Sequence, residues 1–557
     1  MRVGTLAVLA LLFGAPALAQ VDVNPVVATD FGLVTSDLKS VIVTSIQILL
    51  GLVGLAAVVI VMYGGYKYMT SNGIADKVEA AKKIIKNGLV GLGIISLSYA
   101  IVVFVYQLAT GQLGGQGSEF TARQRSSGFN GASYGLGGGS LRYVYPEPYA
   151  NNVARNTKIM AQFREQIDPP SFIDSTDSVF NQANCPASLP ADSVCGKLNS
   201  ANAQIVSADS ETALNGDDAV VMTVDKRSYV IRPLNPLGND KVPTGYTISM
   251  ANIQKVNGKQ AFGSAGYQWT FTVGTFLDNT PPTVVSVLPA KDSTVARNTI
   301  VEVRFSEAVD VTLATGITEV NEDGSLKAGT FSNMLVQTGT QTIPGSWEIG
   351  NGFKTVTFVS AVSCGENITN SCGEQVYCLP GDSVMAATVK SESFLGARDG
   401  ITDTAGNPLD GDPKTKDVFE SYEWSFSTSN VLDLTAPQVT SVTPAKDTAD
   451  VSRKGPFNAL FDKQLNTSTV STDNYWIIYS DPACTAYGVS ESDREELVNQ
   501  GCFPERGYTV SSHTEDITTA SLSSYYPYLS PDMGYSLRLT NKIRDAYQNC
   551  FNPPSGP

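Results

Sequence analysis

The chain has 557 residues, a formal net charge of −15 and eight cysteines. A chain of this length exceeds what one hydrophobic core supports, so several domains are expected. The excess of acidic residues repels phosphate backbones, which disfavours nucleic-acid binding by the exterior.

The chain begins with the features of a cleavable signal peptide. Arg2 precedes the apolar run from Thr5 to Phe13, and Ala17-Leu18-Ala19 follows. A basic start, an apolar segment too short to span a membrane and an A-x-A site are typical of secretory signals. We therefore predict a signal peptide over 1–19 and a mature N-terminus at Gln20, outside the membrane.

Two uncharged apolar runs, 41–66 and 87–117, dominate the next part of the chain. Each exceeds the ~18 to 20 residues that a helix needs to cross ~30 Å of hydrocarbon. We therefore predict a two-helix transmembrane hairpin over 20–110, in contact with membrane lipid. Two buried helices in a soluble core are the alternative, which the length of the runs and the flanking lysines disfavour.

The connector between the runs is cationic, with a net charge of about +3 because Asp76 and Glu79 oppose its five lysines. The positive-inside rule places such a short loop in the cytoplasm and both ends of the hairpin outside. These lysines define a cytoplasmic or lumen-facing loop: Lys67, Lys77, Lys82, Lys83 and Lys86.

Small residues recur in both runs and are candidates for helix packing or assembly. In lipid, helices associate through close backbone approach rather than hydrophobicity. The pattern fits packing within one chain and also assembly between chains, as a homo-oligomer or with other subunits. The candidate residues are Gly51, Gly54, Gly88, Gly91 and Gly93.

The hairpin resembles the pilin subunits of type IV secretion, or conjugation, systems. The resemblance rests on the signal, the two apolar helices, the MYGGYKYMTS-like end of the first helix and the lysine-rich turn, and it covers about 1–112. It implies a structural subunit of a pilus or envelope apparatus whose lysines face the lumen. Those pilins are usually little more than the hairpin, so this chain departs from the family in length.

A Gly- and Ser-rich segment over 111–140 has the composition of a flexible tether, and beyond it the chain repeats itself. In each repeat a proline precedes an arginine, and a phenylalanine follows eight residues after the arginine. In the second repeat, apolar residues at 301, 303 and 305 alternate with Glu302, Arg304 and Ser306, as in a half-buried strand. The repeated residues are Pro146, Pro289 and Pro444; Arg155, Arg297 and Arg453; Phe163, Phe305 and Phe461.

The first two repeats end in aromatic strands, YQWTFTV at 267–273 and YEWSFST at 422–428. The junctions that follow are also alike, so we place domains at 141–278, 279–432 and 433–557. GYTISM in the first domain matches GYSLRL in the third, but no closing strand follows the latter. Either the sequence is a fragment, or a neighbouring chain lends the strand.

This pattern of proline turn, V-[AS]-R-[NK], distant phenylalanine and YxWxF strand resembles the bacterial Ig-like domains of S-layer and surface proteins. The resemblance covers about 140–557 and implies sandwich domains. The predicted fold class is therefore mixed: a transmembrane hairpin followed by three all-β Ig-like sandwiches, whose strands we expect to be antiparallel.

The cysteines have no CxxC spacing and no nearby histidine, which disfavours zinc. Neighbouring cysteines predict the disulfides Cys185–Cys195 and Cys484–Cys502, while the pairing of Cys364, Cys372, Cys378 and Cys550 stays open.

Acidic residues near junctions and turns are the remaining candidate ligands. Asp278, Asp403 and Asp433 are candidates for Ca²⁺, or else they hold turns through their own backbone. His513, the only histidine, is expected in an exposed loop. No catalytic constellation and no cofactor other than Ca²⁺ is indicated, so the chain is not expected to be an enzyme.

These features predict a pilin-like structural subunit of a type IV secretion or conjugation apparatus that displays extracellular Ig-like domains, for instance for surface attachment. The alternative is a membrane-anchored Ig-like adhesin that does not polymerise. In both cases the chain is secreted through the inner or cytoplasmic membrane and resides at the cell surface or in a pilus. The sequence does not identify an extracellular ligand.

Overall fold

The computed structural model describes Thr70, Glu79 and Lys83, and then residues 140–186, 190, 193–208, 213–262, 266–415, 419–504, 508–512, 518–524 and 529–552. The chain divides into two compact units, Met1–Phe120 and Thr121–Pro557. The expected signal peptide, both apolar runs and the tether up to residue 139 lie outside the described residues. In the described part, no helix combines the length and the apolar character that membrane crossing requires.

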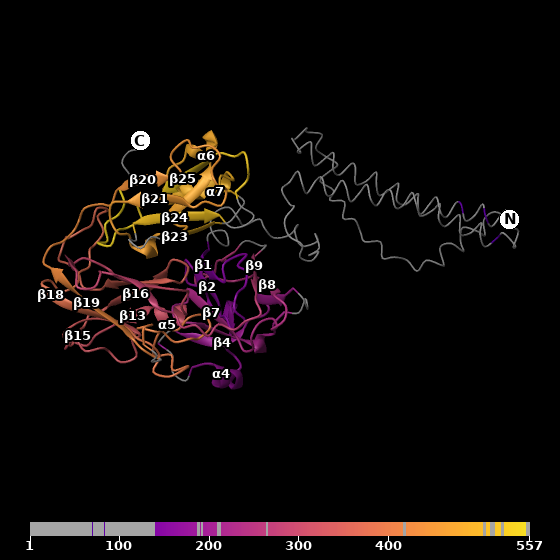
Figure 1. Ribbon diagram of the computed structural model, residues 1–557, viewed down its shortest axis with the longest axis horizontal. Coiled ribbons are helices and arrows are strands. Elements are labelled where there is room, and N and C mark those ends of the chain that lie inside the picture. The colour runs from indigo at the N-terminus through magenta and orange to yellow at the C-terminus, as the bar shows by residue number, and fades with distance from the viewer. Residues whose placement is uncertain are drawn as a thin grey trace. The chain divides into compact units, whose positions relative to one another are not determined.

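Domain 1 contains two β-sheets (Figure 1). The larger has the strand order β1 (Leu141–Tyr145), β2 (Ile159–Phe163), β7 (Ser228–Pro233), β6 (Ala219–Thr223), β4 (Val194–Leu198) and β3 (Ile173–Asp174). The smaller has the order β5 (Ala203–Ser207), β8 (Thr244–Met250) and β9 (Tyr267–Val273). Short helical segments lie between the strands: η3 (Pro169–Ser171), α4 (Ser178–Asn184) and η4 (Gly216–Asp218).

Domain 2 has two five-stranded sheets. One has the order β10 (Val284–Leu288), β12 (Val301–Phe305), β17 (Thr355–Ser360), β16 (Gly345–Gly350) and β13 (Gly316–Thr318). The other has the order β11 (Thr294–Ala296), β19 (Tyr422–Ser429), β18 (Ser383–Val389), β14 (Met334–Thr338) and β15 (Gln341–Thr342). The short helix α5 (Val311–Ala314) follows β12.

Domain 3 has a four-stranded and a two-stranded sheet. The first has the order β20 (Val439–Thr443), β21 (Phe457–Phe461), β24 (Thr519–Ser524) and β23 (Tyr508–Ser512), and the second pairs β22 (Tyr475–Tyr479) with β25 (Tyr535–Leu539). Its helical segments are η5 (Thr467–Thr469), α6 (Pro482–Thr485) and α7 (Glu491–Asn499).

The sequence repeat corresponds to a structural repeat at the start of each sandwich. The repeated phenylalanine ends β2, β12 and β21 and is buried in each domain, as the alternation predicts. Its pairing with the first strand is the same every time, with a register shift after the first pair: Leu141 with Phe163, Val284 with Phe305, and Val439 with Phe461. The three domains are therefore built on the same starting hairpin.

The closing strands β9 and β19 pair antiparallel with β8 and β18. Each carries a buried tryptophan whose indole N–H donates to the carbonyl of the repeated proline: Trp269 to Pro146 at 3.0 Å and Trp424 to Pro289 at 3.1 Å. The YxWxF pattern thus closes the sandwich and also satisfies a buried carbonyl of the proline turn.

In domain 3, β25 pairs with β22, and no other strand of the described residues pairs with it. All five residues of β25 are half-buried, and most of β20 is exposed. In domains 1 and 2 the strands equivalent to β25 are covered by β9 and β19. Among the described residues of domain 3, no strand therefore occupies the position that the closing strand has in its sister domains.

Two sequence expectations need correction. The sandwiches are not wholly antiparallel, because β11 pairs in parallel with β19. The alternation also placed Glu302 on the solvent side of its strand, yet only 1% of Glu302 is exposed. The reason is that domain 3 covers this side of β12, through Thr467.

Candidate functional site at the interdomain junctions

The arginine of the V-[AS]-R-[NK] motif joins distant parts of its own domain. Each arginine donates to a main-chain carbonyl far along the chain: Arg155 to Leu237 (3.0 Å), Arg297 to Cys364 (2.9 Å) and Arg453 to Leu529 (3.3 Å). These bonds lie within one domain, so the arginines have a structural role.

The asparagine after the arginine positions the junction aspartate. In domain 1, the Asn156 side chain donates to the carbonyl of Asp278 (2.8 Å) and accepts from its N–H (2.9 Å). In domain 2, Asn298 makes the same two bonds to Asp433, at 2.7 and 3.0 Å. Each junction aspartate is thus fixed by the domain that precedes it.

At the junction of domains 1 and 2, three carboxylates converge. Asp278 follows β9, Glu307 follows β12, and Asp403 lies in the loop between β18 and β19. One oxygen of each lies within 4.8 Å of the others. The structure thus brings together two aspartates that the sequence indicated, and adds Glu307, which it did not.

The loop around Asp403 fixes that carboxylate, which is fully buried. Its Oδ1 accepts from the N–H groups of Ala405, Gly406 and Asn407, and its Oδ2 accepts from the Asn407 amide at 2.8 Å. The same amide donates to the carbonyl of Asp278 at 3.2 Å. Asp403 therefore belongs to domain 2 but is connected through Asn407 to the junction.

Burial and the repulsion between neighbouring carboxylates raise the pKa values of Glu307 and Asp403. Burial is the main cause that raises the pKa of Glu307 to about 7, and the negative charges of Asp403 and Asp278 add to it. Lys354 opposes the shift. Burial also raises the pKa of Asp403, although Asn407 and Gly406 stabilise its charge. The surroundings of Glu307 and Asp403 therefore stabilise the negative charge of these two groups poorly.

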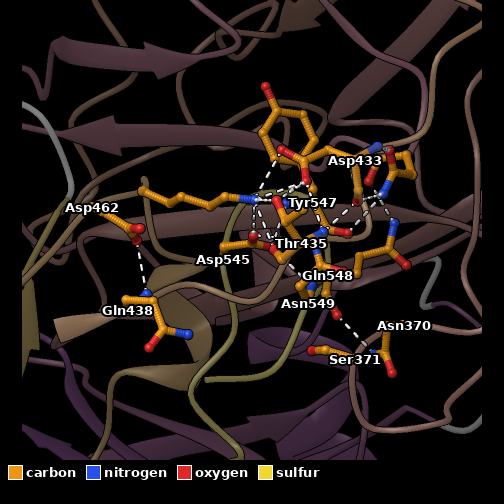
Figure 2. A network of polar contacts seen from close by, with 12 residues as sticks. Asn370, Ser371, Asp433, Thr435, Gln438, Asp462, Asp545, Tyr547, Gln548 and Asn549 are labelled. Carbon is orange, nitrogen blue, oxygen red and sulfur yellow. Dashed lines mark hydrogen bonds and ion pairs between the residues drawn. The ribbon is translucent and has the colours of Figure 1, made fainter. Parts of the chain in front are cut away.

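At the junction of domains 2 and 3, two carboxylates lie around a lysine instead. Figure 2 labels both carboxylates, Asp433 and Asp545. The ammonium of Lys463 lies 2.8 and 2.9 Å from the two oxygens of Asp433 and 3.3 Å from Oδ2 of Asp545. It also donates to the carbonyl and hydroxyl oxygens of Thr435, at 2.7 and 2.6 Å. Asp433 is therefore not grouped with Asp278 and Asp403, but is paired with a lysine of its own junction.

Electrostatics differ accordingly between the two junctions. Burial opposes the charge of Asp433, but hydrogen bonds from Lys463 and Thr435 outweigh it and lower the pKa of Asp433. The fully buried Asp545 keeps a raised pKa because its desolvation is only partly offset by Asn549 and Lys463. Lys463 thus stabilises the negative charge of Asp433 more than that of the buried Asp545.

A buried ion pair and apolar side chains join domain 1 to domain 2. Lys158 lies 2.8 Å from Asp310, with 10% and 1% of the two side chains exposed. Burial raises the pKa of Asp310, but Lys158 and Arg398 outweigh burial and bring the pKa to about 2. Next to this pair, Met160 and Val230 of domain 1 pack into the core cluster of domain 2.

Domain 3 is joined to both other domains. Oε2 of Glu302 in domain 2 accepts from the N–H and the hydroxyl of Thr467 in domain 3, at 3.1 and 2.8 Å. Arg142 and Arg164 of domain 1 form ion pairs with Asp473 of domain 3, at 3.7 and 2.5 Å. Each of the three domains therefore contacts the other two.

All eight cysteines are disulfide-bonded. Both pairs that the sequence favoured, Cys185–Cys195 and Cys484–Cys502, are bonded, and so are Cys364 and Cys378. The two remaining cysteines, Cys372 and Cys550, bond to each other and link domain 2 to domain 3.

Of the predicted hairpin residues, the structure describes one, Lys83. Lys83 is helical and exposed, as is Glu79. The other loop lysines, Lys67, Lys77, Lys82 and Lys86, and the glycines Gly51, Gly54, Gly88, Gly91 and Gly93 lie outside the described residues, as does His513.

Comparison with known proteins agrees with the sandwich architecture. The model of the bacterial Ig-like domain family matches residues 278–364 and 433–555, two ranges that begin at the junction aspartates. Two stretches of the chain are thus similar to bacterial Ig-like domains. No curated protein matches the sequence.

Among solved structures, the chain is similar to the S-layer protein rSbsC(31-844), with 10% identity and a TM-score of 0.18 over 90% of this chain and 64% of that one. It thus spans less than two thirds of that structure. A 1.5-MDa bacterial ice-binding adhesin matches with 10% identity and a TM-score of 0.13 over 72% of this chain and 95% of that one. Likenesses at these TM-scores say nothing about what the chain binds.

Proposed function

We propose that this chain is an exported bacterial surface protein for attachment at the cell surface. In this proposal a membrane hairpin carries three Ig-like domains, each of which contacts the other two and which together form one closed body. The bacterial Ig-like match, the signal-like start and the four disulfides support export, since disulfides persist in oxidising compartments. We propose a structural rather than an enzymatic role.

The main support for this proposal is that each of the three domains contacts the other two. Tandem domains joined by small polar contacts move relative to one another by default. Here a buried ion pair, a buried glutamate, a disulfide and the charge cluster at Asp473 hold all three interfaces. Such a body presents a fixed surface, which suits attachment to a partner outside the cell.

A pilin-like subunit of a type IV secretion or conjugation apparatus is the second candidate. It is favoured by the MYGGYKYMTS segment and the cationic connector, which resemble those of conjugative pilins. In that case the glycines of the hairpin would pack between chains, and the closed body would decorate a filament. The two candidates share topology and differ in polymer state.

Shearing distinguishes them. Cells that express the full chain are sheared, and the released material is imaged with an antibody against the Ig-like body. The surface-protein proposal predicts that the antigen stays with the cells and that detergent extracts it without filaments. Labelled filaments in the sheared fraction would support the pilin candidate instead. Protease added to intact cells tests the topology that both share: it should cut beyond residue 140 and spare the connector near Lys82.

A further inference from the structure

The two junctions are assembled from the same parts in the same order. Five positions correspond between them: Asp278 to Asp433, Thr280 to Thr435, Asp403 to Asp545, Asn407 to Asn549, and Glu307 to Lys463. The first four pairs are chemically identical, whereas the fifth pair has opposite charge. Both positions of the fifth pair lie two residues after the repeated phenylalanine.

The contacts agree with this correspondence. Thr280 and Thr435 donate their N–H to Oδ1 of the junction aspartate, at 2.9 and 3.0 Å. The two asparagine amides donate to the junction carbonyl, at 3.2 Å for Asn407 and 3.0 Å for Asn549. The N–H groups of Asn407 and Asn549 reach Oδ1 of Asp403 and Asp545, both at 2.8 Å. These three contacts are the same at both junctions, and at the first junction the Asn407 amide also donates to the carbonyl of Thr280, at 3.3 Å.

The second junction shows what this arrangement of oxygens holds. The Lys463 ammonium lies within hydrogen-bond distance of five oxygens: both carboxylate oxygens of Asp433, the carbonyl and hydroxyl oxygens of Thr435, and Oδ2 of Asp545. The position between the junction aspartate, its threonine and the buried aspartate is therefore a cation position of this fold. It is filled there by a side chain.

The first junction lacks that side chain and gains a charge. Glu307 replaces the lysine, so three carboxylates surround the equivalent position. Within the described part of the chain, no lysine or arginine is ion-paired with Asp278, Glu307 or Asp403. Lys354 influences Glu307 only at longer range. Like charges held this close in a partly buried site are unfavourable without a counter-charge.

We propose that Asp278, Glu307 and Asp403, with the carbonyl and hydroxyl oxygens of Thr280, bind a divalent cation at the junction of domains 1 and 2, in the position that the Lys463 ammonium occupies at the next junction. The balance of charge indicates a divalent ion. At the second junction, two carboxylates and one ammonium have a net charge of −1, and a divalent ion would give the three carboxylates of the first junction the same net charge.

Ca²⁺ is the ion that these ligands favour. All candidate donors are oxygens, without nitrogen or sulfur, and they come from carboxylate, carbonyl and hydroxyl groups. Ca²⁺ accepts six to eight such oxygens in irregular geometry, whereas Mg²⁺ requires a near-ideal octahedron. The ion would join the linker of domain 1 to a strand end and a loop of domain 2, and so would fix the angle between them. This inference does not depend on where in the cell the protein resides.

The proposal is tested by exchanging the side chains at positions 307 and 463. The full chain is kept in detergent, treated with EDTA and then freed of EDTA before the measurements. Calorimetric titration with CaCl₂ should give one site per chain for the native protein, none for Glu307→Lys and two for Lys463→Glu. Ca²⁺ should raise the melting temperature of the native chain by several degrees. Glu307→Lys in EDTA should melt at or above the native chain in EDTA, because it supplies its own cation.

Retained binding of one Ca²⁺ with native affinity in Glu307→Lys would overturn the proposal, as would a native chain that neither binds Ca²⁺ nor melts at a higher temperature with it. If Lys463→Glu does not fold, Glu307→Gln replaces it, with at least a tenfold weaker affinity expected. MgCl₂ serves as the parallel titrant, and tighter binding of Mg²⁺ than of Ca²⁺ would overturn the choice of ion.

Discussion

Glu302 provides a pH-dependent test of the interface between domains 2 and 3. This side chain is 1% exposed, its Oε2 accepts bonds from Thr467 and Thr357, and its Oε1 has no partner within the described residues. Burial raises its pKa to about 7, against an ordinary value of 4.5, despite those hydrogen bonds. At neutral pH and above, the folded protein thus holds a carboxylate that it stabilises poorly.

The sign of the effect follows from proton linkage. Between pH 4.5 and 7 the unfolded chain loses the proton while the folded chain keeps it, so the free energy of unfolding falls as pH rises. One pKa unit corresponds to about 1.4 kcal/mol, so the loss from this group reaches about 3 kcal/mol above pH 7. Below pH 4.5 both states are protonated and the penalty is absent.

Glu302→Gln removes this titration while keeping the shape of the side chain. The full chain is unfolded with urea between pH 4 and 8, and the midpoint is followed by tryptophan fluorescence. We expect the advantage of the variant over the native chain to grow by about 3 kcal/mol between pH 4.5 and 8. A constant offset from the amide cancels in this difference. Glu348→Gln, at an exposed position of β16, is the matched control. Parallel pH profiles for native chain and Glu302→Gln would refute the reasoning.

Three further perturbations test the other contacts. Lys158→Ala leaves the buried Asp310 without its partner and should destabilise the protein by about 3–5 kcal/mol in urea unfolding, and adding Asp310→Asn should recover part of that loss. Replacing Cys372 and Cys550 by serine opens a link across 178 residues, which is expected to cost up to about 5 kcal/mol and to release domain 3 first in limited proteolysis. A peptide with the sequence YEWSFSTS, that of the domain 2 closing strand, should raise the melting temperature by pairing with the side of β25 on which the described residues place no strand.

Each of these tests has a matched control. Lys327→Ala breaks an ion pair whose partners are 55% and 51% exposed, so little change is expected. Loss of Cys484–Cys502, which closes only 18 residues within domain 3, should leave the contact with domain 2 intact. A scrambled peptide should not alter melting. Equal effects of test and control would contradict the corresponding contact.

Much of each sandwich follows from local patterns in the sequence. The repeated arginine and phenylalanine, the alternating strands and the aromatic closing strands depend on neighbours within one domain, and the structure reproduces them. Local cysteine pairs are likewise accessible, since short loops favour nearby partners. What these features have in common is that their physical cause lies within a few dozen residues.

The interdomain contacts could not be read from those patterns. Glu302 occupies a polar position of its strand, and only the packing of domain 3 buries it. Cys372 and Cys550 are each the odd cysteine of a local group, and their pairing depends on how two domains meet. The difference between Glu307 and Lys463 is visible when the repeats are aligned, because each lies two residues after the repeated phenylalanine of its domain. Its meaning depended on which oxygens the fold brings around that position.

If the three domains are held in contact with one another, the disulfide between Cys372 of domain 2 and Cys550 of domain 3 must be present in the folded protein. Protein from expressing cells is alkylated, digested with trypsin without reduction and mapped by mass spectrometry. The account predicts that the tryptic peptide 355–390, which contains Cys364, Cys372 and Cys378, is linked to the peptide that begins at Asp545 and contains Cys550. Alkylated Cys372 and Cys550 in the folded protein, with the three local disulfides intact, would contradict it.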